Sequence, residues 1–531
     1  MRIILLICVA LNLSGCAYYF GNSWQRSFKK IPKTEYLKFG ARPERISDEQ
    51  LVSHPLVLDV ASDKFISPSQ KAKTSSPRTL LAKLVAHQEV KEVNEFLLNS
   101  VVWGNSGSSG ALNPHGDYDF TSILLSAILF RFENDTNLLW PKTANHLARN
   151  LLIEEGGKPH TKTPRTMKIM KDTENHILMT NISQYLKNQW LFEHGETEFN
   201  NLENGMEQFL LDNLDELQLT GQYEFNAKPY EGYTIAALLV LHSYAHSDAL
   251  RNKTAETLDN LVREYLKTSS DFRKSSPFRR RMERANGTSL VDNPSSSMYK
   301  AWYLEHKKGV FAAEEIPDNR HQAFSALVFD YRPPADVWTV DDSERLVLIG
   351  HGKGSSPEMH SRGKGFLLSA GGFQRGEISQ IIARPTVLML DDDATELADC
   401  FYINGKGEWP TWNNTGVHHR FAVGRSEVHL PKQYEAVDSI GNWKLFKPSA
   451  DMTVVTYSIQ DFGLIYLPEQ GDSLAKLIEM NPEPTSGILH LLGGKFITFD
   501  VKAPKGNWVI KAVDGVEVDR KTDGWPRVRI Q

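Results

Sequence analysis

The chain has 531 residues, of which 40% are hydrophobic and 24% are charged. These proportions are typical of a folded protein rather than a disordered or fibrous one, and the length suggests two to four folding units at about 150 residues each. The net charge of −5 argues against a general nucleic-acid binder, because such proteins present a basic surface to phosphates. Only Cys400 lies beyond the first 16 residues, so we expect a small buried hydrophobe rather than half of a disulfide.

Residues 1–16 have the pattern of a secretion signal, with Arg2 before a short apolar run and small residues after it. The run is too short to span a bilayer as a permanent helix. The motif Leu-Ser-Gly-Cys at residues 13–16 resembles the lipobox of bacterial lipoproteins. The resemblance implies a signal peptide at residues 1–15, a diacylated Cys16 and an outer-membrane location in the cell envelope. A plain signal peptide with an incidental cysteine is the alternative.

Residues 16–76 are polar, irregular and proline-spaced, and we predict a tether that is partly ordered around residues 56–58. From residue 77 to about 315 the apolar periodicity is helical. The expected helices cover residues 80–98, 120–132, 145–154, 174–192, 206–217, 235–241 and 258–266. These segments favour helical hairpins wound into a toroid or solenoid, although no fixed-period repeat is visible.

Residues 316–531 contain short runs rich in β-branched and aromatic residues, divided by Gly, Pro, Asn and Asp. The clearest runs are residues 345–349, 365–373, 454–466, 487–500 and 508–513. Their spacing predicts antiparallel strands in a β-sandwich rather than βαβ units. Helices followed by strands predict an α+β chain with two segregated domains.

The densest polar cluster of the helical region is Asp-Thr-Glu-Asn-His at residues 172–176. An N-cap at either of the first two residues would place Glu174, Asn175 and His176 in the first turn of a helix, where backbone N–H groups and the helix dipole favour an anion. Simple capping with one satisfied histidine is an equal alternative. Tyr185 follows at helical spacing, on a stripe that could face a groove.

Three further clusters carry side chains suited to ligand contacts. Before an apolar run, two carboxylates flank a ring that could stack on a sugar, with N-capping as the alternative: Asp117, Tyr118 and Asp119. At a loop-to-helix junction, phenols could stack or act as a base: Tyr223, Tyr230 and Tyr233. A basic segment could bind carboxylates or sulfates, or remain a solvated face: Arg279, Arg280 and Arg281.

In the predicted β region, Trp409 and Trp412 could line a cleft between the domains and stack on sugar rings, with burial between sheets as the alternative. His418 and His419 are adjacent on an expected strand and would point to opposite faces. The acidic run at residues 391–393 lacks the ligand spacing of a calcium loop. We therefore predict no metal site and no cofactor.

Several of these motifs together resemble a known architecture. They are Gly-Asp-Tyr-Asp at residues 116–119, Glu-Asn-His at 174–176 followed by Tyr-Leu at 185–186, the arginine-rich segment, and Leu-Ser-Ala-Gly-Gly at 368–372. The chain is similar in these motifs to a group of uncharacterised bacterial secreted proteins whose architecture matches polysaccharide lyases of the chondroitin, hyaluronate, alginate and heparin type. From about residue 80 onward, the resemblance implies an (α/α) toroid followed by a β-sandwich, with an acidic glycan in the cleft between them.

Such lyases cleave uronate polysaccharides by β-elimination: an amide or arginine neutralises the C6 carboxylate, and a Tyr or His removes the C5 proton. The resemblance implies that Asn175 neutralises the carboxylate, that His176 acts as base or assistant, and that Tyr230 or Tyr233 moves the proton. It also implies that one of Arg279, Arg280 and Arg281 binds a neighbouring sugar. The stretch 221–233 lacks the histidine that usually precedes the catalytic tyrosine in this architecture.

Two other functions stay open on the sequence. A glycoside hydrolase would pair Glu174 with Asp117 or Asp119, and the separation of the carboxylates would distinguish retention from inversion. A non-catalytic glycan-binding or structural envelope lipoprotein would need none of these groups for chemistry. The partners we expect are an acidic polysaccharide and a membrane reached through Cys16, without nucleic acid.

Overall fold

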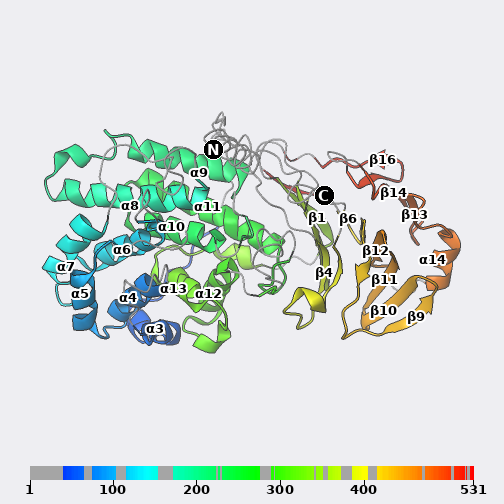
Figure 1. Ribbon diagram of the computed structural model, residues 1–531, viewed down its shortest axis with the longest axis horizontal. Helices are drawn as coiled ribbons and strands as arrows, with labels where there is room; N and C mark the ends of the chain where they lie inside the picture. Colours follow the sequence, from blue (N-terminus) through cyan, green and yellow to red (C-terminus); the bar gives the residue numbers. More distant parts are fainter. Residues whose placement is uncertain are drawn as a thin grey trace, which may run out of the picture.

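The protein separates its helices from its sheets (Figure 1). The computed structural model describes residues 40–64, 75–102, 115–152, 172–222, 225–227, 230–275, 289–291, 294–339, 343–350, 357–371, 385–404, 415–468, 473–503, 508–520, 522 and 527–531. Helices occupy the described chain up to Trp338, and antiparallel strands begin at Arg345. The prediction of a segregated α+β chain is confirmed at this level. Within the described ranges, no helix is both long and apolar enough to cross a bilayer.

The helical part contains elements of very different length. Its α-helices are α2 (Asp48–Val52), α3 (Pro55–Ala61), α4 (Ser75–Val85), α5 (Val90–Asn99), α6 (Asp119–Phe132), α7 (Pro141–His146), α8 (Glu174–Glu193), α9 (Met206–Thr220), α10 (Tyr230–Tyr244), α11 (Asp248–Lys267), α12 (Pro294–Lys308) and α13 (Arg320–Val328). A π-helical turn, η4 (Leu147–Leu151), extends α7, and the 3-10 turns are η6 (Thr197–Phe199), η7 (Ala313–Glu315) and η8 (Ala335–Trp338).

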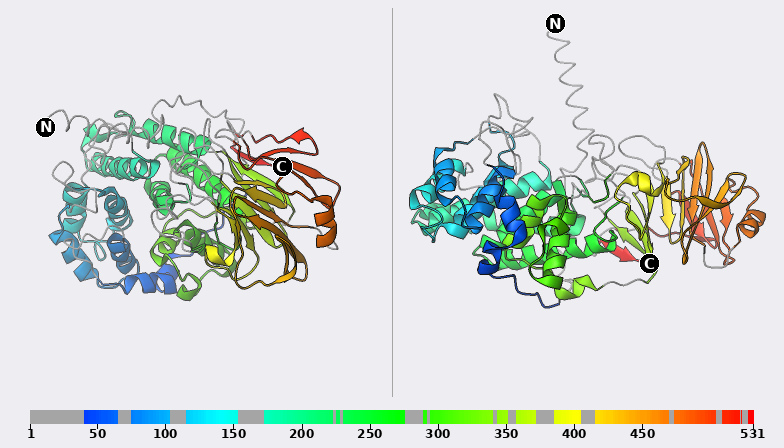
Figure 2. Two further views of the ribbon diagram at one scale, coloured as in Figure 1. Left: turned by 45° about the vertical axis from the view of Figure 1, so that its right-hand side comes forward. Right: turned by 90° about the horizontal axis from the view of Figure 1, so that it is seen from below.

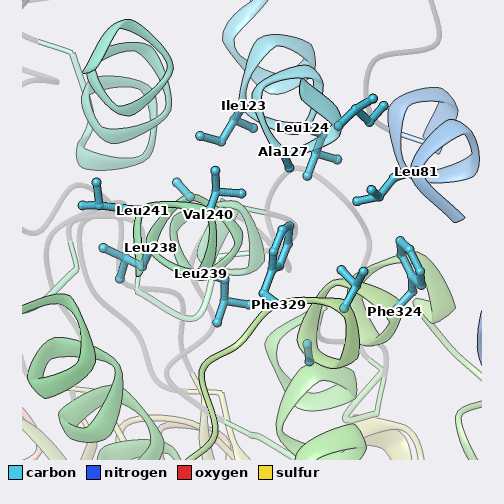
Figure 3. Close-up of a cluster of buried hydrophobic side chains, with 14 of the residues drawn as sticks. Leu81, Ile123, Leu124, Ala127, Leu238, Leu239, Val240, Leu241, Phe324 and Phe329 are labelled. Atoms are coloured by element: carbon cyan, nitrogen blue, oxygen red, sulfur yellow. The ribbon is translucent and has the colours of Figure 1, made fainter. Parts of the chain in front are cut away.

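Helices α6, α8 and α10 are the innermost of these elements. Residues 235–241 of α10 and most of α6 are apolar all round and buried, as helices covered on every side must be. Figure 3 shows their side chains meeting those of α4 and α13 in one core, with Leu81, Leu124, Val240 and Phe324 among them. By contrast, α11 buries one stripe, because its apolar residues recur at helical spacing beside charged ones.

The first turns of five helices lie together at one end of this core. His176 of α8 hydrogen-bonds Asp119 of α6, and the Phe120 ring of α6 contacts Tyr233 of α10. Tyr233 in turn lies under the guanidinium of Arg78 from α4. Ser295 of α12 donates a hydrogen bond to Glu231 of α10 at 3.0 Å. The described helices α4, α6, α8, α10 and α12 therefore begin at a common end.

Three features differ from the sequence-based expectation. The helix expected over residues 80–98 is two helices, because His87 and Glu89 adopt positive φ values of 55° and 47° and break it. Part of the expected tether belongs to the helical core, where Leu51, Leu56 and Val57 are fully buried. The helical part also extends beyond residue 315, through α13 and η8, because α13 and Trp338 contribute buried side chains to the helical core.

The C-terminal part contains three antiparallel sheets within the described chain. The seven-stranded sheet has the order β17-β1-β2-β3-β4-β5-β8, the six-stranded sheet β6-β7-β12-β11-β10-β9, and the four-stranded sheet β13-β14-β15-β16. The strands are β1 (Arg345–Ile349), β2 (Glu358–Gly363), β3 (Phe366–Ala370), β4 (Thr386–Leu390), β5 (Phe401–Ile403), β6 (Thr415–His418), β7 (Phe421–Gly424), β8 (Val428–His429), β9 (Ala436–Ile440), β10 (Trp443–Ser449), β11 (Met452–Ile459), β12 (Phe462–Tyr466), β13 (Ile488–His490), β14 (Phe496–Phe499), β15 (Ile510–Val513), β16 (Val516–Glu517) and β17 (Val528–Ile530). A 3-10 turn, η9 (Leu397–Asp399), and one helix, α14 (Leu474–Met480), interrupt them.

Alternation along the strands builds two cores on opposite faces of the six-stranded sheet. Leu368 of β3 and Val454 of β11 belong to the core shared with the seven-stranded sheet. Val455, the next residue of β11, joins Leu477 of α14 and Phe499 of β14 in the second core. Figure 2 shows the resulting layers side by side. Because successive side chains point to opposite faces of a strand, one strand supplies both cores.

The outer face of the seven-stranded sheet meets the helical part. Arg273, which follows α11, donates to the carbonyl of Leu390 at 3.0 Å and to Asp392 at 3.2 Å. Arg527, just before β17, forms a buried ion pair with Glu264 of α11. Cys400 is buried against this face, as expected for a lone apolar thiol. Polar contacts made by buried side chains therefore join the two parts.

Candidate functional site

The start of α8 holds a buried amide. Thr173 has the extended backbone of an N-cap, but its hydroxyl donates to Oδ1 of Asn175 instead of capping the helix. Asn175 is 0% exposed. Its Nδ2 has no hydrogen-bond partner among the described residues, and such a buried donor costs about 1–3 kcal/mol. The fold therefore keeps an amide donor at this helix start at the expense of stability.

His176 and Asp119 form a pair beside this amide. The His176 Nδ1 lies 2.7 Å from the Asp119 Oδ2, with only 5% and 9% of the two side chains exposed. A histidine that donates its Nδ1–H to a carboxylate carries its lone pair on Nε2. The Phe120 ring packs edge-on against the imidazole at a centroid distance of 5.1 Å and fixes its plane. This arrangement orients His176 as a general base or acid.

Two tyrosines complete the cluster. Tyr233 contacts the Phe120 ring at a centroid distance of 4.6 Å, and Tyr230 lies one turn earlier with its ring 6.4 Å from that of Tyr233. Both tyrosines are only partly buried. Arg78 places its guanidinium 5.8 Å from the Tyr233 ring centroid. A phenol beside a cation can exchange a proton with a bound substrate.

Arg78 is held rigidly in a buried position. It donates to Oγ of Ser325 at 3.0 Å and to Oε1 of Gln322 at 3.1 Å, both on α13. Burial lowers the pKa of Arg78 to about 10, and the neighbouring Tyr233 opposes that change. Arg78 therefore stays charged at neutral pH.

Positive helix ends, one cation and several carboxylates set the electrostatics of the cluster. The amino-terminal ends of α4, α6, α8, α10 and α12 point the positive ends of their dipoles toward the same region. Arg78 adds a positive charge. Carboxylates lie in the same region: Asp119, which is paired with His176, the buried Asp117 and Glu231, and Glu174 of α8. An amide donor, an oriented imidazole and two phenols among these groups suit proton transfer at a carbon next to a carboxylate.

The structure brings only some of the predicted site residues together. Asn175, His176, Asp119, Tyr230 and Tyr233 form the cluster described above. Two other residues of the predicted site border it at the starts of α8 and α6: the partly exposed Glu174 and the buried Asp117.

Tyr118 and Tyr185 do not offer a ring to a ligand. They are 1% and 3% exposed, belong to the hydrophobic core, and have pKa values raised by burial. Tyr185 also lies nine residues beyond His176, about 14 Å along the helix axis. The apolar surroundings of both rings explain why these two predictions do not extend the cluster.

Several predicted residues lie outside the described residues, so the structure does not place them. They are Cys16, Tyr223, Arg279, Arg280, Arg281, Trp409 and Trp412.

Arg78 was missed in the sequence because it follows the segment assigned as a tether. A signal existed: residues 78, 81 and 85 share one face at helical spacing, and residues 81 and 85 are Leu and Val. A cation on the apolar stripe of a helix is a candidate buried charge. Its partners on α13 could not be identified from spacing, since they are more than 240 residues away.

The described residues contain no group of three or more His, Cys, Asp or Glu side chains arranged to hold a metal ion. The run Asp391–Asp393 instead makes contacts with the helical part, through Ser270 and Arg273. No protein-family model matches the chain, and no curated protein sequence matches it. The candidate site therefore rests on its geometry.

Proposed function

We propose that the protein is a lipid-anchored envelope enzyme that cleaves an acidic polysaccharide by β-elimination. In this proposal the helical hairpins close into an (α/α) toroid and the stacked sheets form a β-sandwich. The shared direction of α6, α8 and α10 supports the toroid, and the core between the seven- and six-stranded sheets supports the sandwich. The lipobox-like motif supports an anchor at Cys16 in the outer membrane.

The observation that carries the proposal is the buried Nδ2 of Asn175, which has no hydrogen-bond partner among the described residues, beside the His176–Asp119 pair. An enzyme that removes the proton at C5 of a uronate must stabilise a second negative charge on the C6 carboxylate. Preorganised donors in a site with little water stabilise that charge without reorganisation. The Asn175 Nδ2 has the required chemistry, and the converging helix dipoles add to it.

The remaining residues take roles consistent with their contacts. His176, oriented by Asp119, removes the C5 proton through Nε2. The electron pair left at C5 then forms the C4=C5 double bond while the bond between C4 and the glycosidic oxygen breaks, and the electron pair of that bond leaves with the oxygen. Tyr233 supplies the proton to that oxygen, and it is favoured over Tyr230 because Phe120 links its ring to His176. Arg78 stabilises negative charge near Tyr233.

The direct test is incubation of the purified protein with a panel of uronate polysaccharides, following the ultraviolet absorbance of the unsaturated product. We expect absorbance to rise on at least one substrate and the Tyr233→Phe variant to be about 10²–10⁴ times slower. Tyr244→Phe is the matched control, because Tyr244 lies on the same helix at its opposite end. New reducing ends without absorbance would indicate hydrolysis by the nearby carboxylates, and neither signal across the panel would indicate a binding protein. Either result refutes the lyase proposal.

A further inference from the structure

A second concave site lies at the junction of the helical part and the edge of the seven-stranded sheet. It is a cavity of about 400 Å³ between the carboxyl end of α11, the turn η8 and the strands β1, β2 and β17. None of the candidate catalytic residues lines it. Its polar wall is formed mainly by basic side chains: Arg263, Lys267, Arg345 and Arg362.

Two like-charge pairs face this cavity. Arg345 of β1 and Arg362 of β2 are directly opposite each other in the antiparallel register, an arrangement that is destabilising for like charges. Arg263 and Lys267 are four residues apart on α11, and like charges at that spacing also repel. On the acidic side, Asp336 forms an ion pair with Arg263 at 2.9 Å, and Asp271 lines the same wall. The lining is therefore positive overall.

Among the basic residues of the cavity, Lys267 has the environment that most favours binding of an anionic ligand. It forms no hydrogen bond or ion pair with any of the described residues. Burial, with Arg263 and Arg345 nearby, lowers its pKa against the opposing effect of Glu264. An anion in the cavity would relieve the repulsion among these cations.

Another part of the lining is aromatic. Phe272, Tyr303 and Trp338 line the cavity, with centroid distances of 5.3 Å for Phe272 to Tyr303 and 5.6 Å for Tyr303 to Trp338. Phe272 and Tyr303 are partly exposed. Trp338 is 8% exposed, and its indole N–H has no hydrogen-bond partner in the described chain. Partly exposed aromatic rings suit stacking on a sugar ring with polar substituents.

We propose that this cavity is a subsite for an anionic sugar residue, whose carboxylate or sulfate contacts Lys267 and the Arg345–Arg362 pair. The sugar ring packs on Tyr303 and Phe272. The inference rests on the proposed function only for the source of the ligand, an acidic glycan, since the cavity itself requires only the anion and the ring. Arginine pairs and lysine are the usual donors to carboxylate and sulfate.

The test is calorimetric titration of the purified full chain at low salt with three probes: D-glucuronate, inorganic sulfate and D-glucose. We expect glucuronate to bind, glucose not to bind, and added salt to weaken the binding. Sulfate binding would show that the cations also accept a sulfate group. Lys267→Gln should weaken glucuronate binding about tenfold without lowering the melting temperature. Lys91→Gln is the matched control, because it removes the same charge from a side chain that is 70% exposed on α5.

The results separate this proposal from the proposed catalytic function. Equal affinity in Lys267→Gln and the original protein, or no glucuronate binding by the original protein, would overturn the subsite. Glucuronate binding that Lys267→Gln weakens and Lys91→Gln leaves unchanged assigns the binding to the cavity, because Lys91 does not line it. Glucuronate binding in a protein that releases no unsaturated product would support the subsite while refuting the lyase.

Discussion

Replacing Asn175 by leucine should inactivate the protein without destabilising it. The substitution removes a buried N–H group that has no partner in the described chain, which relieves a cost of about 1–3 kcal/mol. It also removes the hydrogen bond from Thr173, a loss of about 1 kcal/mol. The net change in the free energy of unfolding should lie between zero and a gain of about 2 kcal/mol.

Asn94 provides the matched control. It is also 0% exposed, but its Nδ2 donates to the carbonyls of Val90 and Leu138 at 2.8 and 2.9 Å, and its Oδ1 accepts from the Trp140 N–H at 2.9 Å. Leucine at position 94 leaves the groups of Leu138 and Trp140 unpaired. Two such groups cost about 2–6 kcal/mol in total.

Thermal unfolding followed by circular dichroism distinguishes the two variants. At roughly 2–4 °C per kcal/mol, Asn94→Leu should melt several degrees below the original protein, and Asn175→Leu at or slightly above it. Activity on uronate polysaccharides should disappear only in Asn175→Leu. If both variants lose stability equally, Asn175 is a structural amide and the reasoning about the site fails.

Three further predictions concern stability and reactivity. Burial, with smaller effects of Arg251 and Arg42, lowers the pKa of His242 to about 4, below the unfolded value of about 6.5. Between these two pH values the unfolded chain binds more protons than the folded protein. The free energy of unfolding therefore falls as the pH drops from about 6.5 to 4. Unfolding midpoints in urea across this range should fall less steeply for His242→Phe, and an unchanged slope would contradict the assignment. Arg273→Gln should lower the free energy of unfolding by about 3–5 kcal/mol, because Asp392 and nearby carbonyls lose a cation that is only 5% exposed. Calorimetry should then show separate melting transitions for the helical part and the sheets. Burial raises the pKa of the Cys400 thiol to about 12, so alkylation mapped by mass spectrometry should modify it only after unfolding.

The secondary structure of each part of the chain, helical and then β, was predictable because the spacing of hydrophobic residues follows the side of each element that is buried. The strand expected at residues 345–349 has those bounds, and the helix expected at 174–192 differs by one residue. The break between α4 and α5 was not predictable, because His87 adopts a left-handed conformation that its side chain does not favour. The burial of α3 depends on packing against elements distant in the sequence, which local patterns do not encode.

The sequence predicted which types of residue form the candidate site, but only some of the individual residues that the structure brings together there. Local spacing identified Asn175 and His176 as first-turn residues, and proximity to an apolar run identified Asp119. The contact between Asp119 and His176 spans 57 residues and follows from the packing of α6 on α8. Tyr118 was predicted to contact a ligand because it lies in a polar motif at a helix start, but its side chain belongs to the hydrophobic core.

The ion pair between Arg527 and Glu264 joins residues 263 positions apart, and β17 beside it completes the edge of the seven-stranded sheet by pairing with β1. This contact cannot form until all of the intervening chain has been synthesised. The helical part, whose helices all precede β1 in the chain, can fold earlier. Until β17 pairs with β1, the edge of β1 is exposed and Glu264 of α11 lacks the Arg527 side chain. We expect the chain to be most prone to aggregation at this stage of folding.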